Sequence, residues 1–278
     1  AAATVLAPHG TLWLHLDHRA VHEAKVRLDG RAAVGRFVGE IIWVPGNGAK
    51  ARATLSVTHQ TLLVFAKGPR FVWNVDDPAL REPYAETSLA MHFSTRDEEG
   101  RRYRERIVNG RVYRYYADEG RLRGSVWTDC PAMVANTPLR AETTGYPTQK
   151  PKKLLDRIVR GASRPGGLVV DPFCGSGTTL EVAAAAGRAF VGGDLGDLAL
   201  ATTRARLDAA GVAYIYNDGP AAGETAAAGE TAAAGETAAA DRPAAAGGTA
   251  ADGPAAGGTA ADRPGAAVAA GRSVSARR

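Results

Sequence analysis

The sequence predicts an α/β fold, and three neighbouring features carry that prediction. A short apolar run, Leu168 to Val170, ends in Asp171 and leads into a glycine-rich loop. The next stretch, Thr178 to Ala186, is rich in alanine and has the pattern of a helix. A second apolar run, Ala189 to Gly193, ends in Asp194 about 20 residues after the first loop glycine, where Rossmann-type βαβ units place an acid on a ribose hydroxyl. This order of strand, loop, helix and strand predicts a site for a nucleoside cofactor.

The residue types of the loop suit that chemistry. Gly175 and Gly177 can adopt positive φ and let the backbone approach a ligand, and the helix that starts near Thr178 directs unpaired N–H groups toward it. Asp194 can accept two hydroxyl hydrogen bonds. In a chain with 33 glycines, a Gly-x-Gly alone is as often a simple turn. Its position between a strand and a helix, with an acid after the second strand, favours the cofactor site.

Apolar spacing predicts the flanking elements. Strands are expected at 10–17, 40–44, 61–67 and 212–216, and helices at 19–28, 151–159 and 197–210. The strands at 40–44 and 61–67 are expected to pair antiparallel. The loop that joins them carries Lys50 and Arg52, and phosphate contact and plain solvation explain these two side chains equally well.

Periodicity is lost between residues 69 and 140. Nine arginines lie between Arg96 and Arg123, interleaved with four tyrosines. Arginine with interleaved aromatic residues suits contact with phosphates and exposed bases. Six acidic residues share the window, and on composition alone a salt-bridged surface hairpin is slightly favoured.

The composition changes beyond residue 216. GETAAA repeats loosen into a mixture of Ala, Gly, Pro and Asp that offers nothing large enough for a core, so residues 217–278 are predicted to be a disordered tail and residues 1–216 the folded domain. Acidic residues outnumber basic ones in the tail. The tail carries a net charge of −2, so the net charge of +5 for the whole chain leaves +7 on the folded domain, which favours a nucleic-acid partner.

Other compositional features bound the class of protein. The 278 residues contain no long apolar span and no signal peptide, which predicts a soluble, cytoplasmic chain without a membrane partner. The two cysteines, Cys130 and Cys174, lie far apart in sequence. They suit a reducing compartment and do not have the spacing of metal ligands.

Several blocks resemble one enzyme family. GYPTQKPKKLLDRIV, LVVDPFCGSGTTLEVAAAAGR and FVGGDL resemble the carboxyl-terminal half of the β-class amino-methyltransferases of DNA, which modify the exocyclic amine of adenine or cytosine. LAPHGTLWLHLD, FVGEIIWV, SVTHQTLLVFAKG and VWTDCPAM resemble that family in the same order, so the resemblance covers roughly residues 5–210. The pairing of TQKP with DPFCGSGTT is far more specific than a lone glycine motif. The resemblance implies a Rossmann-like methyltransferase sheet with helices on both faces, and S-adenosylmethionine as cofactor.

The resemblance also implies roles for single residues. Asp171, Phe173, Gly175 and Gly177 match the loop that wraps the methionine part of the cofactor, and Asp194 matches the acid that holds its ribose. Thr148, Gln149, Lys150 and Pro151 match the segment over the amino-acid end, where Lys150 would pair with the carboxylate. Residues 74–140 fall where the family has its target-recognition segment, which implies contact with double-stranded DNA. The basic residues expected to contact DNA are Lys50, Arg52, Arg101, Arg102 and Arg104.

One departure from the family concerns catalysis. The catalytic loop, an Asp, Ser or Asn followed by Pro-Pro and an aromatic residue, is expected upstream of Leu6 and is absent, so no catalytic residue is assigned. Asp77-Pro78-Ala79 and Asp129-Cys130-Pro131 lack the second proline and the aromatic residue. The loop follows a strand that, in this architecture, lies between the strands at 168–170 and 10–17. We therefore expect an open position in the sheet and a chain truncated at its N-terminus.

The function predicted from the sequence is site-specific DNA methylation from S-adenosylmethionine, as a solitary methylase or as the modifying half of a restriction-modification system with a cognate endonuclease as partner. The alternative is a catalytically inactive remnant that binds cofactor or DNA. A nicotinamide-dependent enzyme is disfavoured, because Thr178, Thr179 and Leu180 follow the second loop glycine where GxGxxG requires a third. RNA remains open beside DNA, and the target base, the recognition sequence and the oligomeric state are not decided.

Overall fold

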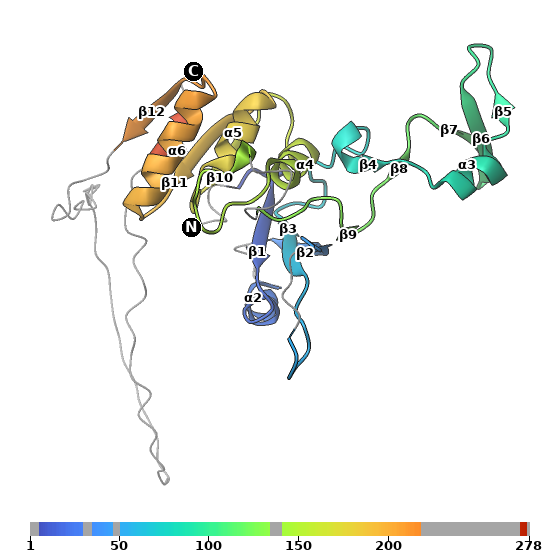
Figure 1. The fold of residues 1–278 in the computed structure, drawn as a ribbon. Helices are drawn as coiled ribbons and strands as arrows, with labels where there is room; N and C mark the ends of the chain where they lie inside the picture. The colour runs from blue at the N-terminus through green and yellow to red at the C-terminus, as the bar shows by residue number, and fades with distance from the viewer. Residues whose placement is uncertain (1–5, 30–34, 47–50, 134–140, 218–272, 277–278) are drawn as a thin grey trace, which may run out of the picture. The chain divides into compact units, whose positions relative to one another are not determined.

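The computed structural model describes residues 6–29, 35–46, 51–133, 141–217 and 273–276 (Figure 1). These residues form two four-stranded sheets, a three-stranded sheet and a two-stranded sheet, together with helices, so the predicted α/β class is confirmed. Within these ranges no helix combines the length and the apolarity that a membrane crossing requires. Nor do three or more His, Cys, Asp or Glu side chains of these residues gather in a way that could hold a metal ion.

The first four-stranded sheet contains the predicted antiparallel pair. Its order is β1 (Thr11–Leu16), β3 (Gln60–Ala66), β2 (Arg36–Trp43) and β9 (Val126–Trp127). Strand β3 runs antiparallel to both β1 and β2, and β9 runs parallel to β2. The predicted strands at 10–17, 40–44 and 61–67 are therefore confirmed.

Helices cover both faces of this sheet. Successive side chains of a strand point to opposite faces. Leu12, Leu14 and Leu16 of β1 pack on the side of α2 (Val21–Leu28), in a cluster with Leu63 and Phe65. The intervening Trp13 lies in a second cluster, to which α4 (Lys152–Ala162) contributes Leu154 and Ile158.

The second four-stranded sheet contains the predicted βαβ unit. Strands β10 (Leu168–Asp171) and β11 (Ala189–Gly193) are parallel and are connected through α5 (Thr178–Ala185). Helix α6 (Asp197–Ala209) follows, and then β12 (Tyr214–Asn217). Side chains of α4, α5 and α6 form one core with this sheet, including Val159, Leu180, Leu207 and Phe190. The predicted elements of this half are confirmed, with ends that differ by three residues at most.

The outer face of the second sheet is exposed in the described part of the chain. Leu168, Val170 and Ile215 are 60%, 48% and 53% exposed. Their neighbours Val169, Tyr214 and Tyr216 point the other way, into the helix-covered core. Helices of the described ranges therefore cover one face of this sheet and both faces of the first.

The predicted tail contains a strand. Residues 217–278 were expected to be disordered throughout, but β13 (Ser273–Ala276) lies between β11 and β12 and is antiparallel to both. Its Val274 is fully buried in the core of the second sheet. The four residues of β13 supply one buried apolar side chain and two ladders of backbone hydrogen bonds. A segment this short hardly changes the composition of the tail, so composition could not predict it. The prediction for 218–272 lies outside the described residues.

Strands β10 and β1 are both edge strands in the described part of the chain. Strand β10 pairs with β11, and β1 pairs with β3, but no described strand pairs with the other side of either. The sequence predicted an open position between these two strands, and the topology agrees with it.

The segment expected to be irregular contains regular structure. It holds η1 (Pro78–Leu80), β4 (Arg81–Glu82), α3 (Glu86–His92), β5 (Thr95–Arg96), β6 (Arg102–Val108), β7 (Arg111–Tyr116) and β8 (Arg121–Leu122). Strands β6 and β7 form a hairpin closed by Asn109 and Gly110, whose φ angles are 52° and 75°. Positive φ at both positions is the geometry of a tight two-residue turn, for which Asn-Gly is the preferred sequence. The window therefore contains a hairpin with ion pairs, as the surface-hairpin alternative expected, and this does not by itself exclude contact with nucleic acid.

Candidate cofactor-binding site

The glycine loop after β10 has the backbone geometry that the sequence predicted. Gly175 and Gly177 adopt φ angles of 53° and 73°. A Cβ atom on Gly177 would lie 2.8 Å from Oγ1 and 3.0 Å from Cα of Thr203, a contact that side chains do not make. On Gly175 it would lie 3.2 Å from the ring of Tyr146. Positive φ favours glycine at both positions, and at Gly177 the close contact with Thr203 excludes a side chain as well.

Asp194 is attached to the loop directly. Its Oδ2 accepts a hydrogen bond from the backbone N–H of Gly175 at 2.9 Å, and its Oδ1 accepts one from Gly196 at 3.0 Å. A carboxylate has about four lone-pair positions, so these two bonds leave capacity for further donors such as sugar hydroxyls. The acid at the end of β11 and the glycine loop at the end of β10 thus form one unit.

Two large apolar side chains beside this unit are exposed. Phe173, in the loop, is 84% exposed, and Leu195, directly after the acid, is 82% exposed. Asp171 accepts the backbone N–H of Phe173 at 3.2 Å, which shapes the start of the loop. Exposed apolar surface of this size at a polar loop suits contact with a flat, partly apolar group such as a nucleobase. The sequence analysis included Phe173 but missed Leu195, although its position after the acid was visible.

The predicted segment 148–151 follows Tyr146, whose ring lies against Gly175 of the loop. Gln149 holds this segment in place. The Gln149 side chain is buried, accepts from the N–H and hydroxyl of Thr144 and donates to the carbonyl of Glu142. Pro151 precedes the first residue of α4 as its N-cap, and Thr148 accepts a hydrogen bond from the Lys150 ammonium at its carbonyl. Gln149 and Pro151 are therefore structural.

Lys150 is partly buried, and no described residue places a carboxylate within ion-pair distance of its ammonium. Burial lowers the pKa of Lys150, because it removes water from the charged form. His15 at the end of β1 lies near enough for the lysine charge to act on it. Burial and then that charge lower the pKa of His15 to about 4, against a hydrogen bond with Gln60, and its Nε2 has no partner among the described residues. An anionic group at this place would be stabilised by Lys150, and the sequence analysis missed His15 because a lone histidine in a strand carries no signal.

Helix α6 supports the loop from behind. Thr203 donates from its hydroxyl to the carbonyl of Gly175 at 3.0 Å, and Arg206 donates from Nε to the carbonyl of Ser176 at 2.6 Å. Arg206 also pairs with Glu181 of α5 at 2.8 Å. Burial, first of all, raises the pKa of Cys174 to about 11, so this loop cysteine is a neutral thiol and no nucleophile. The loop is therefore rigidly backed by groups that the sequence analysis did not identify.

The arginines predicted to contact DNA already have protein partners. Arg101 forms ion pairs with Asp118 at 2.9 Å and Glu119 at 3.1 Å. Arg102 donates to the carbonyls of Phe93 and Leu89, at 2.9 and 2.7 Å. These contacts hold the hairpin to α3 and to the turn after β7, a structural role.

The remaining basic residues of that prediction differ among themselves. The guanidinium of Arg104 lies over the rings of Phe93 and Tyr84, at 5.1 and 5.4 Å from the ring centroids. Arg52 is exposed, and Lys50 lies outside the described residues. Of the four described residues in that prediction, Arg52 is exposed and has no ion pair with a described residue, whereas Arg101 is partly exposed but paired with acids.

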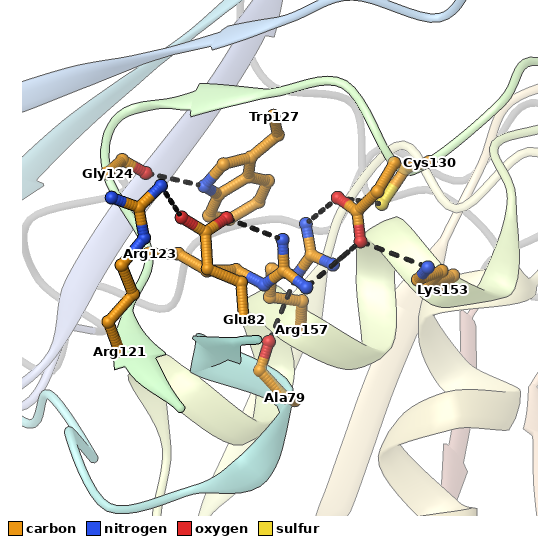
Figure 2. A network of polar contacts seen from close by, with 10 residues as sticks. Ala79, Glu82, Arg121, Arg123, Gly124, Trp127, Cys130, Lys153 and Arg157 are labelled. Carbon is orange, nitrogen blue, oxygen red and sulfur yellow. Dashed lines mark hydrogen bonds and ion pairs between the residues drawn. The ribbon is translucent and has the colours of Figure 1, made fainter. Parts of the chain in front are cut away.

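An ion-pair network ties α4 to part of the segment that the sequence predicts to recognise DNA, here called the recognition segment (Figure 2). Arg157 of α4, whose side chain is 2% exposed, donates to both carboxylate oxygens of Asp129, at 2.9 and 2.7 Å, and to the carbonyl of Ala79 at 3.0 Å. Lys153 and Arg123 also pair with Asp129, at 3.0 and 3.1 Å. Burial alone would raise the pKa of Asp129, but the hydrogen bonds from Arg157 and Lys153 outweigh it and hold that pKa well below its usual range.

Comparison with known proteins decides the family. The family model described as DNA methylase matches residues 1–203, well over half of the chain. This chain belongs to the DNA methylase family. Type II methyltransferase M1.MboII of Moraxella bovis is 34% identical over 162 residues, which are 57% of this chain and 58% of that protein. DNA adenine methyltransferase YhdJ of Escherichia coli K12 is 42% identical over 90 residues, which are 32% of this chain and 29% of that protein.

The match is partial in length. The DNA methylase chain described here spans less than two thirds of these relatives. A solved structure, the complex of M1.HpyAVI with SAM, overlays on 74% of this chain and 78% of that chain, with 20% sequence identity and a TM-score of 0.48. A likeness at that level is too weak to argue from, and the family assignment rests on the sequence match.

Proposed function

We propose that this chain binds S-adenosylmethionine and forms part of a site-specific methyltransferase that acts on the exocyclic amine of adenine or cytosine in DNA. The observation that carries the proposal is the attachment of the Asp194 carboxylate to the Gly175 amide at 2.9 Å, in a chain of the DNA methylase family. The arrangement offers a bare loop for a cofactor backbone and an acid for its sugar hydroxyls.

Each residue of the site takes a defined part in this proposal. Asp194 would accept the ribose hydroxyls, and the loop from Phe173 to Gly177 would lie along the methionine part. Lys150 would pair with the cofactor carboxylate, which would restore the pKa that burial lowers. Phe173 and Leu195 offer apolar surface to the adenine. When bound, S-adenosylmethionine supplies an activated methyl group on a sulfonium centre.

Two acids lie in the strings that come nearest to the family's catalytic sequence, and both are bound within the fold. Asp77 caps η1 through the N–H of Ala79 and pairs with Arg160 at 2.9 Å. Asp129 is occupied by Arg157. Both strings that came nearest to the family's catalytic sequence are therefore structural, and methyl transfer requires a group that neither of them provides.

Calorimetric titration of S-adenosylmethionine into the full chain tests the cofactor assignment. We expect binding, and we expect Asp194→Ala to weaken it about tenfold to a hundredfold, because charge-assisted hydrogen bonds contribute roughly 1.5–3 kcal/mol. Asp208→Ala, at the opposite end of α6, is the control and should leave the affinity unchanged. Equal affinity in the Asp194 variant would refute the assignment.

Transfer of labelled methyl groups to duplex DNA separates the two functional alternatives. Binding accompanied by transfer supports an active methyltransferase, whereas binding without transfer favours the inactive remnant. We propose double-stranded DNA as substrate, a nucleoid location, and a restriction endonuclease of the same specificity as partner, since M1.MboII is named a type II methyltransferase. Protection of the methylated DNA from such an endonuclease would test that partnership.

A further inference from the structure

The β6–β7 hairpin sorts its charges between its two faces. Residues that face each other across an antiparallel pair share a face, and successive residues alternate. The register pairs Arg104 with Tyr115, Arg106 with Tyr113 and Val108 with Arg111. One face, here called the arginine face, therefore carries Arg102, Arg104, Arg106, Val108, Arg111, Tyr113 and Tyr115.

The opposite face is neutralised. It carries Tyr103, Glu105, Ile107, Val112, Arg114 and Tyr116. Glu105, the sole acid in the sequence of the two strands, pairs there with Arg114 at 3.0 Å. Arg101 precedes β6 on the same side, since it lies 3.8 Å from the centroid of the Tyr116 ring, and is paired with Asp118 and Glu119. We call this the paired face, because each of its arginines has a carboxylate partner.

The arginine face itself divides along its length. At its base, Arg102 is bonded to carbonyls of α3 and its cap, and Arg104 lies over aromatic rings, as described above. Toward the turn, Arg106 and Arg111 are exposed, and in the described ranges neither has a carboxylate partner. Tyr113 lies across the strand from Arg106, with the Arg111 guanidinium 5.6 Å from its ring centroid. The outer half of this face thus presents two guanidinium groups without carboxylate partners among the described residues, beside the ring of Tyr113, which is 41% exposed.

We propose that Arg106, Arg111 and Tyr113 form the surface of the hairpin that contacts nucleic acid. The inference rests on the proposed function and deepens it, because it places the contact on residues other than Arg101, Arg102 and Arg104. Guanidinium groups bind phosphate oxygens, and a tyrosine ring between them can stack on a sugar or a base. A two-stranded ribbon is narrow enough to enter the major groove, which is about 12 Å wide.

The salt dependence of DNA binding by the full chain tests this assignment. Each phosphate contact contributes about 0.9 to the slope of log K against log salt. Arg106→Ala together with Arg111→Ala should therefore reduce the slope by about 1.8 and the affinity near 0.1 M salt by roughly fiftyfold. The matched control is Arg101→Ala with Arg114→Ala, which removes two charges from the paired face of the same hairpin and should change the slope by much less.

Three outcomes would overturn the inference: an unchanged slope in the first double variant, equal changes in both double variants, or no DNA binding by the unaltered chain at any salt concentration. Arg106→Lys with Arg111→Lys guards against a folding artefact, because it keeps both charges and should retain the slope. Calorimetric binding of S-adenosylmethionine, measured on the same samples, keeps the two proposals separate. If the chain binds S-adenosylmethionine but the Arg106→Ala, Arg111→Ala variant keeps the full salt slope, the hairpin surface is rejected and the proposed cofactor site is not.

Discussion

Substitution of Arg157 by methionine should remove the contact that holds the recognition segment to α4. The Arg157 side chain is 2% exposed and makes two hydrogen bonds to Asp129 and one to the carbonyl of Ala79, while its guanidinium lies 4.8 Å from the centroid of the Trp127 ring. Methionine retains most of the apolar volume but none of the donors. The partly buried carbonyl of Ala79 then loses its donor, and the loss for a buried group would be roughly 1–3 kcal/mol.

The loss of a buried ion pair costs about 3–5 kcal/mol when a charge is left alone. Asp129 keeps Lys153 and Arg123 in the variant, so we expect a value near the lower end, about 3 kcal/mol. A domain is stable by about 5–15 kcal/mol in total, so this is a large fraction. Urea unfolding followed by circular dichroism would measure the change in the free energy of unfolding.

The control for this prediction is Lys153→Met on the same helix. Lys153 binds the same carboxylate at 3.0 Å, but its side chain is 54% exposed. Exposed ion pairs contribute about 0–1 kcal/mol. The reasoning is refuted if Arg157→Met lowers the free energy of unfolding by less than about 1 kcal/mol, or by no more than Lys153→Met does. Burial of Arg157 would then not increase the contribution of its ion pair to stability.

Three further predictions follow from single features of the fold. The depressed pKa of Asp129 contributes stability that is present above about pH 4 and is lost as the pH falls through the folded-state pKa, so Asp129→Asn should flatten the acid limb of stability against pH. Deletion of residues 218–278 should lower the free energy of unfolding by about 2 kcal/mol or more, because β13 buries Val274. Replacement of residues 218–272 by Asn-Gly should leave that free energy unchanged. Asn217 and Ser273 are already paired across the antiparallel ladder, so a two-residue turn can join them. Gly177→Ala should destabilise the chain by more than Gly187→Ala, because both glycines have positive φ but the Cβ meets Thr203 only at Gly177.

Each of these has an outcome that contradicts it. Parallel acid limbs for the Asp129 variant and the unaltered chain would show that other carboxyl groups control acid unfolding. Equal stability of both tail variants would mean that β13 does not contribute to the sheet. Equal unfolding free energies for the two glycine variants would place the whole effect on φ and none on the close contact with α6.

The sequence predicted best where a residue's own chemistry demands one structure. Gly175, Gly177 and Asp194 sit in a strand, loop and helix pattern that few arrangements satisfy, and the structure places all three together. The same holds for the antiparallel pair of β2 and β3, whose short continuous apolar runs are typical of strands in a covered sheet. Such features are local, and local sequence is sufficient to indicate them.

The sequence predicted poorly where the partner of a side chain decides its role. Arg101 and Arg106 are both arginines of one window, yet the first is bound to acids that follow β7 and the second is not. Only the hairpin register separates them, because it fixes which face each side chain occupies. Likewise, Val274 lies in a segment whose composition favours disorder, and it is buried because two strands far away in sequence leave a place for it.

Helix α4 connects the candidate cofactor site to the recognition segment. Its Leu154 and Ile158 pack against the first sheet, and its Leu155 and Val159 against the second. Lys150 lies just before its first turn, and Arg157 binds the recognition segment from its middle. One rigid helix therefore contacts both sheets and both candidate functional regions. We therefore expect a change in the Arg157 network to affect the glycine loop through α4, because both regions pack against the same helix.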